Sequence, residues 1–144
     1  GTQPIHLDFG PIARLYAFDV APQRTAPGNE VKVTLCWQAL GAAENDYSVF
    51  VQFVGEADSI VGRRGTYPGL GSFPTSLWQP GDTFCDLYRV PVNGDAQGSA
   101  VYAVEVGLFD LQTGDRVPVT DAAGNRLEFA GATDAEQARL QVNL

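Results

Sequence analysis

The chain has 144 residues, 44% of them hydrophobic, with 17 acidic against nine basic residues and a formal net charge of −8. That length suffices for one buried core, so we expect a single domain over residues 1–144. The acidic balance excludes nucleic acid as a partner, because its recognition needs basic patches.

No run of 18 apolar residues is present, so direct membrane insertion of this segment is not expected. The chain contains no methionine and starts at Gly-Thr-Gln-Pro. From this start we expect a domain excised from a longer polypeptide.

Short β-patterned runs recur along the chain, separated by Gly, Pro and Asn turns. The alternation is clearest where Val31, Val33, Leu35 and Trp37 share one face. The predicted strands cover residues 5–9, 12–20, 31–38, 47–54, 59–62, 84–90, 100–109, 116–119, 127–129 and 139–144. Helical spacing is confined to one turn at 133–138.

Eight to ten such strands predict an all-β fold, an antiparallel β-sandwich of immunoglobulin-like or jelly-roll-like type. The segment 47–54 is apolar on both faces except at Ser48 and Gln52, which predicts a central strand. In 84–90 an acidic residue, Asp86, shares the face of Tyr88 and Val90. The residues expected between the sheets are Trp37, Val49, Val51, Val104 and Val106.

A Gly- and Pro-rich loop at 63–82 carries Tyr67 and Trp78, and two arginines, Arg63 and Arg64, stand at its start. A loop of this length is often functional, and its aromatic residues favour an ordered loop on the β-scaffold. The aromatic rings either pack on the core or form a platform for sugar rings. The arginines are polar partners of such a ligand or simply solvated. These four residues are the candidate ligand-binding set.

The sequence holds no catalytic constellation, so we predict that the chain is not an enzyme. His6 is the only histidine, and no nucleophile motif accompanies it. Asp82 and Asp86 lie about 13 Å apart along a strand, which is too far for a glycosidase pair.

Acidic and amide side chains at Asp110, Asp115, Asp121 and Asn125 flank Gly turns. Such residues bond to their own backbone in turns, and this interpretation is favoured over a calcium site. We therefore predict no metal and no other cofactor.

The two cysteines, Cys36 and Cys85, lie 49 positions apart, which fits no zinc or redox motif. They are either two free thiols or one disulfide, and a disulfide would indicate an oxidising compartment. By alternation both point to the outer face of a sheet, so neighbouring strands would allow a cross-strand bridge.

Six phrases stand in a specific order: FGPIARLYAFD at 9–19, PGNEVKVTLCWQA at 27–39, YSVFVQ at 47–52, PTSLWQPGD at 74–82, DLYRVP at 86–91 and YAVEVGLFDLQTGDR at 102–116. This order resembles a bacterial β-sandwich module over residues 9–144. Such modules are similar to the C-terminal extracytoplasmic part of membrane glycosyltransferases of the dolichyl-phosphate-mannose protein mannosyltransferase type. Against the resembled pattern, Cys36 replaces an aromatic and Cys85 an aliphatic residue, which favours a pair.

The resemblance implies a non-catalytic accessory or interaction domain of a larger, membrane-bound glycosyltransferase-like protein. Its location would be extracytoplasmic or at the cell surface, and its partner another domain of the same polypeptide. The alternative is a carbohydrate-binding module that uses the loop aromatics. Exposure of Trp78 beside Tyr67 would favour the module, and burial of Trp78 the accessory domain.

Overall fold

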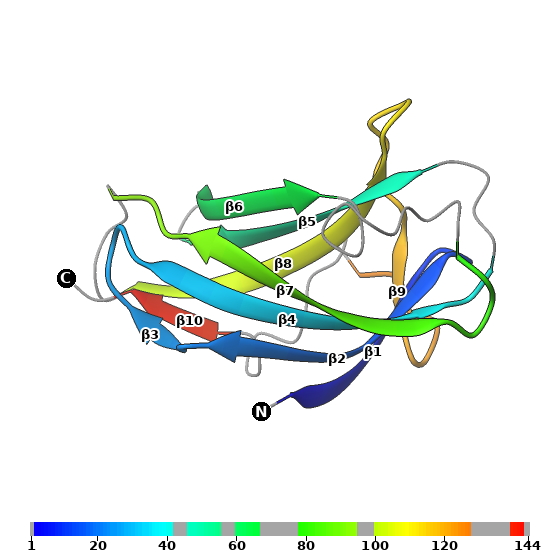
Figure 1. Cartoon of the computed structure of the whole chain (residues 1–144), viewed down its shortest axis with the longest axis horizontal. Helices are drawn as coiled ribbons and strands as arrows, with labels where there is room; N and C mark the ends of the chain where they lie inside the picture. The colour runs from blue at the N-terminus through cyan, green and yellow to red at the C-terminus, as the bar shows by residue number, and fades with distance from the viewer. Residues whose placement is uncertain are drawn as a thin grey trace.

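The computed structural model describes residues 2–41, 46–55, 60–66, 78–94, 100–127 and 139–142. In these residues it shows ten strands and no helix, and the strands form two stacked five-stranded sheets (Figure 1). The strands are β1 (Gln3–Phe9), β2 (Ala13–Ala21), β3 (Arg24–Thr25), β4 (Glu30–Ala39), β5 (Tyr47–Val54), β6 (Ile60–Thr66), β7 (Thr83–Pro91), β8 (Ala100–Asp110), β9 (Val119–Asp121) and β10 (Arg139–Val142).

Sheet A has the strand order β7-β4-β2-β1-β9, and sheet B has the order β3-β10-β8-β5-β6. The strand pairs are antiparallel except for β3 with β10. The predicted antiparallel β-sandwich is confirmed. Its assignment to the immunoglobulin-like or jelly-roll-like type stays a prediction.

The core lies between the two sheets and follows the period-two alternation of the strands. All five residues predicted for it are buried, with exposed fractions of 2% or less. Trp37 meets Phe9 edge to face, with 5.1 Å between the ring centroids. The predicted central position of β5 is also confirmed, because this strand pairs with β6 on one side and β8 on the other.

The strand predictions were wrong at several boundaries. The two-residue strand β3 has no periodicity to reveal it, and it exists through its pairing with β10. β6 continues to Thr66, so Arg63 and Arg64 lie in a strand and not in the loop. Pairing with β5 holds these polar residues in the sheet.

Further along the chain the predicted run 116–119 is largely irregular, because Arg116 makes an isolated bridge to Phe109 and β9 begins only at Val119. Leu127 belongs to no strand. The rest of the run 127–129 and the helical turn 133–138 lie outside the described residues. No helix capable of crossing a membrane occurs in the described part of the chain.

A bulge interrupts the pairing of β2 with β4. Leu15 pairs with Trp37 and Ala17 pairs with Cys36, so Tyr16 is an extra residue on β2. A bulge lets two residues of one strand oppose a single residue of its neighbour and re-aims their side chains. Leu15 and Phe18 both stay buried as a result, while Tyr16 and Ala17 are both partly exposed.

Candidate functional site

Of the four predicted ligand-binding residues, the structure describes the side chains of Trp78 and Arg63. Trp78 is 1% exposed, and its ring contacts that of Phe84 edge to face at 5.0 Å. The burial of Trp78 corrects the hypothesis of an exposed sugar platform, because a large apolar ring gains most by packing in the core. Tyr67 lies outside the described residues.

The two arginines stand on adjacent positions of β6. Arg63 is exposed and pairs with Gln52, and the backbone of Arg64 pairs with Val51. The side chain of Arg64 is outside the described part of the structure.

Asp82 and Asp86 lie in two different environments. Asp86 is buried, and the hydroxyl of Tyr88 donates a 3.0 Å hydrogen bond to it. This bond explains how an acidic residue shares the inner face of β7. Asp82 accepts a 3.0 Å hydrogen bond from the backbone N–H of Gln79 in an exposed turn.

The acidic turns are built by Asp side chains that bind nearby backbone. Asp121 accepts hydrogen bonds from the N–H groups of Ala123 and Asn125 at 3.0 and 2.8 Å. The N–H of Asn125 is the main cause that lowers the pKa of Asp121. Asp110 accepts a 2.7 Å bond from the N–H of Gln112. These bonds show the turn chemistry that the sequence favoured.

His6 lies at the surface of β1, with its Nε2 3.5 Å from Oδ1 of Asp8. Within the described residues, no group of three or more His, Cys, Asp or Glu side chains is placed to bind a metal ion.

A buried polar cluster lies on the outer side of sheet B, opposite the core. Gln52 Nε2 donates a 2.7 Å hydrogen bond to Glu105 Oε1, and Arg116 Nη1 lies 3.4 Å from the same oxygen. The Arg116 guanidinium also stands 4.7 Å from the centre of the Phe50 ring. Gln52 and Glu105 are 5% and 7% exposed, so a ligand has little access to them. Through the contacts of Arg116, this cluster connects the segment that follows β8 to the outer side of sheet B.

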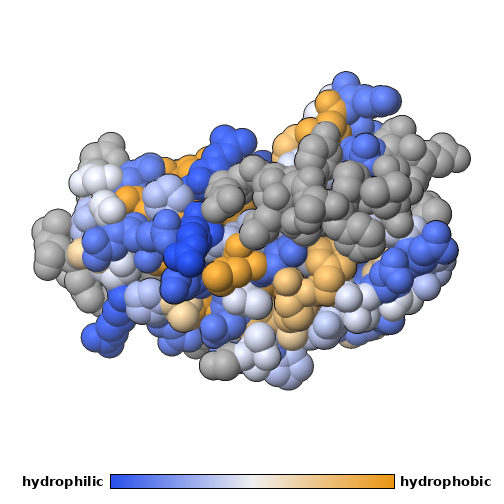
Figure 2. Space-filling model, viewed as in Figure 1, coloured by the Kyte–Doolittle hydropathy of each residue, from blue (hydrophilic) through white to orange (hydrophobic). Residues whose placement is uncertain are grey.

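The outward side chains of β1, β2, β4 and β7, termed the sheet A face, offer a more open surface. Outward positions alternate with buried ones along β4 and β7. Figure 2 shows apolar surface over the middle of β7 and β4, bordered by hydrophilic surface. The exposed Leu87, with 38% of its surface accessible, belongs to β7.

A disulfide cross-links β4 and the edge strand β7 on this face. Cys36 and Cys85 pair directly across β4 and β7, with an S–S distance of 2.09 Å and a Cα–Cα distance of 4.0 Å. Cys36 is buried and Cys85 is exposed. The sequence placed both residues on an outer face, and the adjacency of their strands brings the two sulfurs together.

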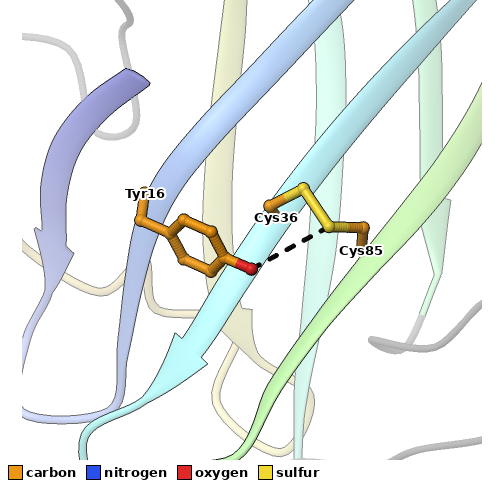
Figure 3. Close-up of a disulfide and its surroundings, with 3 residues drawn as sticks. All are labelled: Tyr16, Cys36 and Cys85. Carbon is orange, nitrogen blue, oxygen red and sulfur yellow. Dashed lines mark hydrogen bonds between the residues drawn. A yellow bond between two sulfur atoms is a disulfide. The ribbon is translucent and has the colours of Figure 1, made fainter. Parts of the chain in front are cut away.

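Tyr16 covers the disulfide from the side of β2. Its hydroxyl lies 4.0 Å from Cys85 Sγ, and Figure 3 shows the side chain extending across the face toward the two sulfurs. The ring is partly exposed. The bulge turns Tyr16 outward, and its ring lies along the sheet A face beside the disulfide.

Ion pairs occupy both ends of the face. Arg14 Nε and Nη2 donate to the two carboxylate oxygens of Asp8 at 2.7 and 3.2 Å. The hydrogen bond from Arg14 lowers the pKa of Asp8. At the other end, Arg89 Nη1 donates to Glu30 Oε1 at 3.1 Å.

Tyr16 was missed because a regular strand over 12–20 would group Arg14, Tyr16, Phe18 and Val20 on one face. That grouping mixes a charge with core residues. The conflict is the signal from which a bulge near Tyr16 could have been suspected.

No protein-family model matches the sequence, and no curated protein matches it at a significant level. Among solved structures, the C-terminal domain of Wzt matches 99% of this chain and 83% of that chain, with a TM-score of 0.60 and 12% sequence identity. The sporulation control protein Spo0M from Bacillus subtilis matches 99% of this chain and 50% of that chain, with a TM-score of 0.44 and 16% identity.

The likeness to the Wzt domain shows a shared β-sandwich fold. It supports the β-sandwich part of the resemblance drawn from the sequence. The specific similarity to mannosyltransferase-type modules stays a prediction.

Proposed function

We propose that this domain is a non-catalytic carbohydrate-binding module and that the sheet A face is its binding surface. The observation that carries the proposal is the Tyr16 ring, held along an open sheet beside the disulfide. A sugar ring has an apolar C–H side, which packs on an aromatic ring, and a rim of hydroxyl groups, which needs hydrogen-bond partners.

Neutral polar side chains stand on both sides of the ring. Gln38 pairs with Thr83 on one side of the disulfide, and Thr34 pairs with Leu87 on the other side. Hydroxyl and amide groups both donate and accept hydrogen bonds, as sugar hydroxyls do. The face thus combines an aromatic platform with flanking groups that match the rim of a sugar.

The scaffold supports a fixed position for the ring. The bulge in β2 turns Tyr16 outward, and the disulfide gives its hydroxyl a neighbour on β7. A binding side chain on a rigid strand holds its geometry better than one on a loop. This proposal moves the sugar-binding hypothesis from the loop aromatics to the sheet.

The test is a glycan-array screen of the wild-type domain, followed by titration of each glycan that binds. We expect Tyr16→Ala to weaken binding by at least about tenfold, which corresponds to about 1.4 kcal/mol. Tyr16→Phe keeps the ring and should retain most of the affinity.

Leu111→Ala is the distant control, because Leu111 is exposed in the turn after β8 and should not affect binding. Equal glycan affinity of Tyr16→Ala and the wild type, with both folded, would contradict the proposal.

A second candidate is the accessory domain of a larger, extracytoplasmic glycosyltransferase-like protein, and the burial of Trp78 and the disulfide both favour it. Disulfides persist mainly in oxidising compartments. Labelling intact cells that make the protein with a membrane-impermeant reagent tests the location. Labelling of the domain before lysis supports it, and labelling only after lysis speaks against it.

A further inference from the structure

We infer that the ligand of the sheet A face is a neutral, hydroxyl-rich glycan chain and not an acidic polysaccharide. This inference rests on the proposed function and specifies the ligand class of the same surface. Three observations support it: the charges of the face sum to zero, its arginines pair with carboxylates of the protein, and neutral polar side chains lie between these ion pairs.

The outward charges of the sheet A face, on β1, β2, β4 and β7, cancel. Three carboxylates stand against three cations, so the formal charge of the face is zero with His6 neutral. They are Asp8, Asp19 and Glu30, and Arg14, Lys32 and Arg89. The whole chain carries −8, so its excess negative charge lies elsewhere. The net negative charge of the chain repels a polyanion, and the sheet A face has no excess of cations to attract one.

Both arginines of the face already hold a carboxylate. Arg14 is engaged by Asp8 through two hydrogen bonds, at 2.7 and 3.2 Å. Arg89 is engaged by Glu30 at 3.1 Å. The guanidinium fork is the group that recognises carboxylates, sulfates and phosphates, and here its partners are internal. An acidic sugar would compete with a carboxylate of the protein for either arginine.

The middle of the face offers the opposite chemistry. Tyr16 and Ala17 lie opposite Cys36, and Cys85 completes this weakly polar row. On β4, Thr34 lies two residues before Cys36 and Gln38 lies two residues after it. From Gln38 to Thr34 the strand spans about 13 Å, so the neutral polar groups lie far enough apart to contact successive sugars. A chain running along β4 would place C–H faces on the ring and hydroxyls on the amide and hydroxyl groups.

The test titrates the full chain with two groups of probes at pH 7.5. The neutral probes are mannan, laminarin and galactomannan, and the acidic probes are polygalacturonate and dextran sulfate. Each titration runs at about 20 mM and about 500 mM NaCl, because added salt weakens contacts between exposed charges. Tyr16→Ala and Tyr16→Phe are measured beside the wild type.

We expect at least one neutral probe to bind, with an affinity that salt changes by less than about twofold. Tyr16→Ala should reduce that affinity by at least about tenfold. Binding of acidic probes alone, weakened by salt and lost in Tyr16→Ala, would overturn the neutral class and leave the proposed function standing. Failure of every probe in both groups would overturn the proposed function together with this inference.

Discussion

Trp78 and Tyr16 are the two residues that decide where this domain offers an aromatic surface. Trp78 is fully packed against the core and touches Phe84, whereas Tyr16 is partly exposed on an outer strand face. The tryptophan therefore serves stability, and the tyrosine is the side chain available to a ligand.

We predict that Trp78→Ala lowers the free energy of unfolding by about 3–5 kcal/mol, because it removes a large buried ring and leaves a cavity. Urea denaturation followed by circular dichroism measures this change. Leu111→Ala, at a 44% exposed position, is the control and should change stability little. A Trp78→Ala variant as stable as the wild type would show that the ring is not part of the core.

At the scale of elements, the aromatic ring of Phe50 on β5 packs over Gly107 on the neighbouring strand β8. Phe50 pairs directly with Gly107, and a Cβ added to Gly107 would lie 2.2 Å from two atoms of the Phe50 ring. No side chain other than that of glycine fits beneath the ring. Gly107 thus lets Phe50 lie against the sheet, where Arg116 stands over it.

We predict that Gly107→Ala destabilises the domain by about 1–3 kcal/mol through this overlap. The cost should largely disappear in a Phe50→Ala background, since residues in contact couple and the ring is then absent. Gly94→Ala is the matched control, because no atom lies within 4 Å of the Cβ it adds. Equal costs of Gly107→Ala in both backgrounds, measured by urea denaturation, would refute the contact.

At the scale of the whole molecule, the disulfide joins segments that are 49 positions apart and ties the edge strand β7 to β4. Sheet A places five strands side by side, and only β4 pairs with β7 in that sheet. The cross-link therefore closes a long loop and also borders the proposed binding surface.

We predict that Cys36→Ala/Cys85→Ala lowers the free energy of unfolding by roughly 4 kcal/mol, because the unfolded chain regains the freedom of an open loop. Denaturation of the wild type with and without dithiothreitol is the control, and the reduced wild type should resemble the variant. Two titratable thiols in the unfolded, unreduced wild type would contradict the bridge.

Period-two alternation allowed the fold class and much of the core to be predicted from the sequence. Whether a residue such as Val33 or Val106 faces inward depends on its own strand, and a strand's alternation is a local property. The same alternation placed Cys36 and Cys85 on outer faces. It could not show that their strands are neighbours, since strand order depends on the whole chain.

The candidate site depended on the tertiary structure for the same reason. The bulge that turns Tyr16 outward exists only in the pairing of β2 with β4, and the pairing of β6 with β5 keeps Arg63 and Arg64 in a strand. Trp78 is buried because the rest of the core surrounds it. The sequence alone determined which face of the sheet each regular strand position takes. Strand register and contacts between distant segments decided which side chains meet. Those contacts stabilise the fold only once the distant segments have come together.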